Sequence, residues 1–310
     1  MPLQASIRGV IGDDLHMAHQ RHLLNQPPDP NPRKPAHAVP DMAWDCHIHL
    51  FGPASQFQFE ATSPYTSDDA LPEDYLRMQK TLGLKRAVIV SAGGYGANYR
   101  HIESVLTRFG EHFRGIVLAR SDFRADEVAH LNELGVRGVR FFEGPPNHEW
   151  SHLPAIDPRI AALVHEAGWH CQFQSLIRGH IVEVADRLLA LPTPIVLDHF
   201  GNFQPLLGVD QPAFRTILKM LETGKVWLKL SGPMRNSDED FPYSGMTPFA
   251  KILVRHAPER LLWGSDWPHV QMNGRGMPND GDLVDLLSEW VPDEATRKRI
   301  LTENPLTLYR

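Results

Sequence analysis

Two histidines one residue apart, His47 and His49, could do chemistry together. They end the segment Trp44-Asp45-Cys46-His47-Ile48-His49, whose composition is typical of a β-strand. Side chains two positions apart on a strand face the same side. We therefore expect both imidazoles to project into one site, with Cys46 and Ile48 turned to the other face. A pair of imidazoles placed in this way can bind a metal or polarise a carbonyl group.

Two further candidates follow later apolar segments. His199 comes after Pro194-Ile195-Val196-Leu197-Asp198, at the predicted last position of a strand, and Asp266 follows Leu261-Leu262-Trp263-Gly264-Ser265. A carboxylate next to so apolar a segment needs histidines, a metal or backbone donors beside it. Asp266 is also suited to take a proton from a bound water. We predict a catalytic set of His47, His49, His199 and Asp266.

The rest of the chain predicts the elements that would bring these side chains together. Eight apolar segments alternate with eight amphipathic ones, which indicates a parallel α/β fold. The count of eight favours a (β/α)8 TIM barrel over a doubly wound sheet, and Ala92–Gly96 lacks the spacing of a dinucleotide-binding loop. Barrel enzymes carry their reacting groups at the C-terminal ends of the strands. The predicted strands are 43–49, 86–91, 114–119, 137–142, 169–174, 194–199, 225–231 and 260–264, and the predicted helices lie near 72–82, 98–109, 124–134, 157–167, 179–191, 211–223, 245–256 and 279–303.

The length and the net charge of the chain limit the classes of protein to which it can belong. The chain has 310 residues, enough for one barrel of about 250 residues with additions. We predict a polar, proline-rich arm over residues 1–38 and the barrel over residues 39–310. The net charge of -6 argues against a nucleic-acid partner. No segment predicts a membrane span or a signal peptide, so we expect a cytoplasmic protein, and its two cysteines are expected to be packed thiols.

Taken together, the three site motifs resemble the amidohydrolase superfamily, in its amidohydrolase-related branch. The motifs are Asp45-x-His47-x-His49, Asp198-His199 and Trp263-Gly264-Ser265-Asp266-Trp267-Pro268-His269. Gly135–Phe141 and the terminal Asn304-Pro305-x-x-x-x-Tyr309 also fit, so the resemblance covers residues 42–310. Within the branch, the chain is most similar to 2-pyrone-4,6-dicarboxylate lactonases and related lactone hydrolases. Four segments carry this closer resemblance: Ser63-Pro64-Tyr65-Thr66, Arg140 after the fourth strand, Ser231-Gly232-Pro233-Met234-Arg235, and the loop from Trp267 to Gly281.

The resemblance implies hydrolysis of a carboxylated lactone, a small anionic substrate. In that hypothesis Asp266 activates water, while His47, His49 and His199 hold the carbonyl oxygen in place of a metal. Arg140 and Arg235 would clamp substrate carboxylates, and Tyr65, Ser91 and Gln172 are candidates for further polar contacts. One departure stands out. The lactonases carry a second arginine shortly after the fourth strand, where this chain reads Phe141-Phe142-Glu143-Gly144-Pro145-Pro146.

The sequence leaves alternatives open for the metal dependence of the protein and for the reaction that it catalyses. Zinc could bind at His47, His49 and Asp266, but Gln172 and Gln174 occupy the positions where a fifth-strand histidine ligand is expected. We therefore expect no cofactor. The rival functions are a sugar-acid lactone hydrolase or isomerase, a zinc-dependent hydrolase or decarboxylase, and a non-catalytic binding protein. A homo-oligomer is left open.

Overall fold

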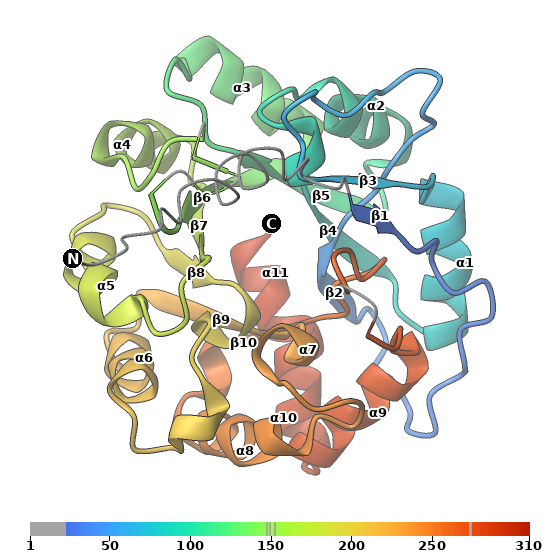
Figure 1. The fold of residues 1–310 in the computed structure, drawn as a ribbon, viewed down its shortest axis with the longest axis vertical. Coiled ribbons are helices and arrows are strands. Elements are labelled where there is room, and N and C mark those ends of the chain that lie inside the picture. The colour runs from blue at the N-terminus through green and yellow to red at the C-terminus, as the bar shows by residue number, and fades with distance from the viewer. Residues whose placement is uncertain (1–22, 147, 149, 152, 273–274) are drawn as a thin grey trace, which may run out of the picture.

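Eight parallel strands form the centre of the molecule. The computed structural model describes residues 23–310 apart from 147, 149, 152 and 273–274. Neighbouring strands pair in the order β10-β9-β8-β7-β6-β5-β4-β2. Figure 1 looks into the resulting ring, with most helices around it and the C-terminal helix seen within its outline. The first residue of each strand lies within two residues of the predicted one. The bounds are β2 Trp44–Ile48, β4 Arg86–Val90, β5 Phe113–Leu118, β6 Val136–Glu143, β7 His170–Ser175, β8 Ile195–Leu197, β9 Val226–Ser231 and β10 Leu261–Gly264.

The first and last strands of the ring meet at a seam next to the predicted site. The backbone N–H of Asp266 donates to the carbonyl oxygen of His47 at 2.9 Å, and the N–H of His49 donates to that of Trp267 at 2.8 Å. An isolated parallel bridge joins Ile48 to Trp267. The sheet therefore closes on itself, and the predicted (β/α)8 barrel is confirmed. His47, His49 and Asp266 all belong to this seam.

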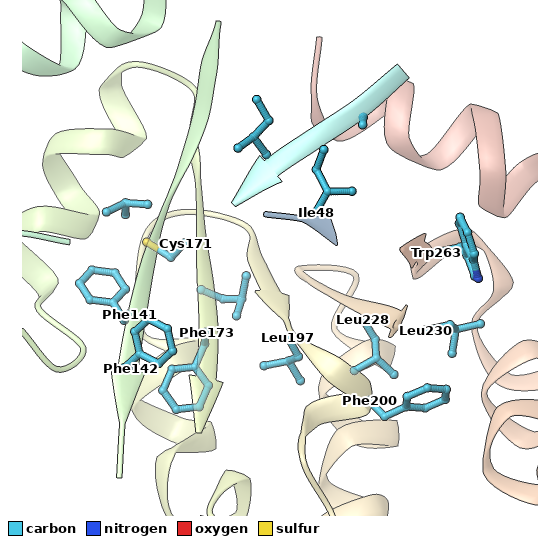
Figure 2. Close-up of a cluster of buried hydrophobic side chains, with 14 of the residues drawn as sticks. Ile48, Phe141, Phe142, Cys171, Phe173, Leu197, Phe200, Leu228, Leu230 and Trp263 are labelled. Carbon is cyan, nitrogen blue, oxygen red and sulfur yellow. The ribbon is translucent and has the colours of Figure 1, made fainter. Parts of the chain in front are cut away.

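The helices cover the outside of the ring. Phe141, Phe173, Leu197 and Leu228 lie among the buried side chains that join strands to helices (Figure 2). The predicted helix 279–303 is divided, because Pro292 has no N–H to continue the first part. The helices are α1 Pro72–Leu82, α2 Arg100–Phe109, α3 Ala125–Leu134, α4 Pro158–Glu166, α5 Ile181–Leu189, α6 Pro212–Glu222, α7 Pro233–Asn236, α8 Thr247–His256, α9 Asp280–Trp290, α10 Glu294–Lys298, a π-helical turn Arg299–Glu303, and α11 Asn304–Leu308.

One end of the barrel interior is apolar. Inward side chains from opposite strands form a separate buried cluster that includes Trp44, Cys46, Val88, Ile116, Val196, Leu262 and Tyr309. The expectation that Cys46 points away from the interior is therefore wrong. The pairing of β2 with β4 shifts register between Asp45 and Ile48. Such a bulge places two consecutive residues, Cys46 and His47, on the inner side.

The described segment before the barrel contacts it at several places. β1 (Leu23–Asn25) pairs in parallel with β3 (Tyr65–Ser67), outside the main sheet. Farther along, Arg33 forms an ion pair with Asp285 at 3.0 Å. The arm predicted over 1–38 stays a prediction, because residues 1–22 lie outside the described part of the chain. Within the described part, no helix has both the length and the apolar character needed to span a membrane.

Candidate active site

A cavity of about 480 Å³ opens at the C-terminal ends of the strands. This size suits a small ligand. Its position agrees with the general placement of active sites in such barrels. Three arginines, two aspartates and two of the predicted histidines line it. The lining includes His49, Tyr65, Arg140, Phe142, Trp150, Gln174, Arg178, Asp198, His199, Arg235 and Asp266.

Three imidazoles surround one oxygen of Asp266. The Nε2 atoms of His47 and His49 each lie 3.8 Å from Asp266 Oδ1, and Nε2 of His199 lies 3.9 Å from it. All four side chains are buried. Among the described protein atoms, neither Asp266 Oδ1 nor His47 Nε2 has a hydrogen-bond partner. The four predicted catalytic residues therefore converge on one point where a water or a carbonyl oxygen can be held.

The backbone at this point is in an uncommon conformation. Asp266 has φ of 69° and His199 has φ of 44°, a region that costs about 1–3 kcal/mol for residues other than glycine. His199 begins a 3₁₀ turn, His199–Gly201, instead of ending a strand as predicted. Gly232 leaves the space that these residues need, since a Cβ there would lie 2.7 Å from His199 Nδ1. The turn aims the His199 ring across the barrel toward Asp266.

Burial favours the neutral form of the three rings. Burial lowers the pKa of His49 to about 4, and it also lowers the pKa of His47 and of His199. Each ring therefore carries a single N–H. Nδ1 of His49 lies 2.8 Å from the carbonyl oxygen of Val90, which can only accept, so the proton of His49 sits on Nδ1. Its Nε2 is then an acceptor, which differs from the expectation that all three rings donate to a carbonyl oxygen.

Asp266 is held as a carboxylate. Burial opposes its ionisation, but the charge of Arg235 and then the neighbouring histidines outweigh burial and bring the pKa of Asp266 well below its usual range. Nε of Arg235 donates to Asp266 Oδ2 at 2.8 Å. The Arg235 side chain is 20 % exposed and lines the cavity. A substrate anion therefore has access to a guanidinium group that already holds the base.

A charged network lies beneath His47. Asp198 Oδ2 accepts hydrogen bonds from Arg140 Nε at 2.8 Å and from Gln172 Nε2 at 2.9 Å. Lys229 Nζ donates to Gln172 Oε1 at 2.7 Å and lies 3.3 Å from both Asp198 Oδ1 and His47 Nδ1. All five side chains are nearly or fully buried. Three charged groups inside a protein are stable only when paired in this way.

The predicted substrate-binding residues occupy different depths. Arg140 lines the cavity, where its guanidinium stacks on the Phe142 ring at 4.5 Å. The buried Tyr65 lines it too, with its hydroxyl 3.3 Å from the N–H of Gly94. Gln172 lies below, in the network under His47. Ser91 follows β4 and is not among the described residues that line the cavity, so these two are farther from a ligand than expected.

Comparison with known proteins agrees with this geometry. A family model described as amidohydrolase matches residues 44–310. The chain belongs to the amidohydrolase family. It is 36% identical to a 4-sulfomuconolactone hydrolase of Rhizobium radiobacter, over 88% of this chain and 91% of that protein. It is 35% identical to a 2-pyrone-4,6-dicarboxylate hydrolase of Comamonas testosteroni, over 90% and 93% of the two chains. An apo crystal structure from Agrobacterium tumefaciens superimposes with a TM-score of 0.78 at 26% identity, covering 89% of this chain and 98% of that one.

The donor atoms of this amidohydrolase form one candidate metal site among the described residues. Ligand atoms of His47, His49 and Asp266 lie within 4.8 Å of one another. His49 fits a metal ligand, since its other ring nitrogen donates to a carbonyl oxygen. Two groups face the other ring nitrogen of His47: the Lys229 amine, a donor, at 3.3 Å and the Asp198 carboxylate, an acceptor, at 3.2 Å. The three side chains are a possible zinc site, and the position of the proton on His47 decides whether its Nε2 can take part.

Several residues of the candidate site were not predicted from the sequence. Asp45 accepts from the N–H and the hydroxyl of Ser265, at 2.9 and 2.6 Å, and so ties β2 to the residue before Asp266. Lys229 is the one charged residue in the apolar segment Val226-Trp227-Leu228-Lys229-Leu230. That pattern could have predicted a buried amine paired with another buried polar group. Arg178, on the loop after β7, also lines the cavity. No sequence pattern distinguishes this loop arginine from other surface arginines.

Proposed function

We propose that this protein hydrolyses a lactone that carries acid groups. The observation that carries the proposal is a carboxylate ringed by three imidazoles, at 3.8–3.9 Å, in a cavity lined by Arg140, Arg178 and Arg235. The two relatives described above are named for lactones that bear sulfo or carboxylate groups. Arginine is the side chain best suited to bind such anions by paired hydrogen bonds.

The first step is attack of water on the ring carbonyl. Asp266 Oδ1 takes one proton from the water, and the bare Nε2 of His49 accepts a hydrogen bond from its other hydrogen. The new C–O bond turns the carbonyl oxygen into an oxyanion. We assign the proton of His199 to Nε2, with the Ser231 hydroxyl donating to its Nδ1 at 3.1 Å. The Nε2–H groups of His47 and His199 then hold that oxygen and stabilise its charge. Each such donor contributes about 10²–10³ in rate.

Collapse of the tetrahedral intermediate opens the ring. The bond between the carbonyl carbon and the ring oxygen breaks, and Asp266 returns its proton to that oxygen. The product is an open-chain acid, and Asp266 is again a carboxylate. An anionic substrate that draws Arg235 away from Asp266 would also make the carboxylate a stronger base, because Arg235 is the main group that lowers its pKa. Substrate charge and base strength would then be linked.

The test is turnover by metal-stripped protein. A panel of carboxylated pyrones, sulfo- and carboxymuconolactones and aldarolactones is incubated with protein freed of metal, and ring opening is followed with product analysis. We expect hydrolysis of at least one acid-bearing unsaturated lactone. Turnover only after zinc is added would contradict the proposed mechanism. Conversion of a sugar-acid lactone to an isomeric lactone would instead select the isomerase. A cytoplasmic location and a homo-oligomeric state stay predictions from the sequence.

A further inference from the structure

Lys229 is a buried amine that the proposed reaction does not use. It lies in the middle of β9 and is 0% exposed. Its neighbours on β9, Leu228 and Leu230, belong to the cluster outside the ring, so Lys229 points inward. There its Nζ contacts an amide oxygen, a carboxylate and the Nδ1 atom of His47, which is 3.3 Å away.

We propose that Lys229 is a positioning residue that fixes the single N–H of His47 on Nε2, facing Asp266. Burial lowers the pKa of Lys229, but the Asp198 carboxylate 3.3 Å away favours its ammonium form. An ammonium group can donate hydrogen bonds but cannot accept them. The nitrogen that faces it must therefore offer its lone pair, and the proton of the neutral ring must sit on the other nitrogen. Lys229 thus makes His47 a hydrogen-bond donor toward the cavity and denies that nitrogen to a metal ion.

The two histidines of the His-x-His pair then have opposite roles. The Nδ1 atom of His49 faces the Val90 carbonyl oxygen, an acceptor, whereas the Nδ1 atom of His47 faces an amine. One ring presents a lone pair to Asp266 and the other presents an N–H. This division supplies one group for the attacking water and one for the carbonyl oxygen, from two side chains that are two residues apart.

Asp198 is the group that would reverse the arrangement. Its Oδ1 lies 3.2 Å from His47 Nδ1. That oxygen accepts no hydrogen bond from the described protein atoms, while its Oδ2 is occupied by Arg140 and Gln172. Without Lys229, the Nδ1 atom of His47 could carry the proton and donate it to Asp198. Nε2 would then be bare, as in histidines that bind metals.

The first experiment uses the unchanged protein. Nitrogen-15 NMR of histidine-labelled protein reports which ring nitrogen carries the proton, and spectra of H47N and H49N assign the two rings. We expect the proton on Nε2 of His47 and on Nδ1 of His49. A His47 signal with the proton on Nδ1 overturns the proposal.

The second experiment changes the donor. Zinc affinity is measured by competition with a chromophoric chelator for Lys229→Met, Lys229→Arg and the exposed control Lys219→Met on α6, each checked by thermal melting. We expect Lys229→Met to bind zinc at least about tenfold more tightly, since bare imidazole is a good zinc ligand. Lys229→Arg keeps a donor-only group and should behave like the unchanged protein, as should the control. Unchanged zinc affinity in Lys229→Met overturns the proposal. If Lys229→Met does not fold, the NMR measurement decides alone.

The catalytic consequence rests on the proposed lactone hydrolysis. Lys229→Met should lower the metal-free kcat by about 10²-fold, the effect of losing one oxyanion donor. The KM for an acid lactone should change less, because Arg178 and Arg235 are untouched. Neither the NMR nor the zinc measurement needs a substrate. A failure of the lactone proposal can therefore be told apart from a failure of the role given to Lys229.

Discussion

The two halves of the barrel interior are built from the same strands but from opposite kinds of side chain. Toward one end, the inward residues of β8, β9 and β10 are Val196, Trp227 and Leu262, part of a buried apolar cluster. Two positions later, Asp198 follows β8 and Lys229 lies on β9, while β10 leads into Asp266. The change from apolar to charged happens within one repeat of the strand pleat.

This difference separates stability from chemistry. The apolar half contributes by burial, at about 25 cal/mol per Å², and needs no specific partner. The charged half is stable only because its groups pair with one another, as Asp198 does with Arg140 at 2.8 Å. We therefore expect substitutions in the charged half to change rate and pH dependence, and substitutions in the apolar half to change the free energy of unfolding.

The largest effect on rate is expected at Asp266. Asp266→Asn keeps the shape of the side chain but removes the proton acceptor, so kcat for the lactone should fall at least about 10³-fold. Steady-state kinetics with metal-free protein measures this. Thermal melting serves as the control for folding, and a variant that keeps kcat within tenfold of the unchanged protein would exclude Asp266 as the base.

Arg235 should affect both binding and pH dependence. Arg235→Gln removes a charge-assisted contact, which is worth about 1.5–3 kcal/mol, so kcat/KM should fall by about 10–100-fold. Arg235 lowers the pKa of Asp266, so its removal raises that pKa. The base is active when ionised, and the acid limb of the kcat/KM profile should therefore move to higher pH. A limb that stays in place or moves to lower pH contradicts this assignment.

Arg178 should set the preference for a second acid group. It pairs with Asp238 at 3.0 Å, but that carboxylate is 61% exposed, and exposed pairs are weak. A substrate anion can therefore replace Asp238. Arg178→Met should raise KM about tenfold for lactones with two acid groups and less for those with one. Asp238→Asn is the matched control, because it frees Arg178 and should not raise KM.

The apolar half should give the smallest effect on rate. Ile116 is fully buried on β5, in the apolar cluster. Ile116→Ala should reduce the free energy of unfolding by about 2–5 kcal/mol, measured by urea titration. The kcat at room temperature should be unchanged. A large loss of kcat with a small loss of stability would show that the two halves are not independent.

The fold and the four catalytic candidates could be predicted because they depend on local patterns. Apolar strands alternating with helices are visible along the chain, and His47, His49 and Asp266 follow such strands directly. The state of each ring could not be predicted, because it depends on partners far away in sequence. Val90 and Lys229 face the two histidines from different strands. The bulge at Cys46 was also hidden, since it arises from the pairing of β2 with β4.

The seam between β2 and β10 has a consequence for how activity arises during folding. Asp45 and Ser265, which bond across it, are separated by 220 positions in the sequence. Contacts between such distant segments form late, because the loop between them must first be ordered. The base and its imidazoles therefore meet only when the last strand docks against the first. The rate at which catalytic activity recovers during refolding would therefore report the rate at which the barrel closes.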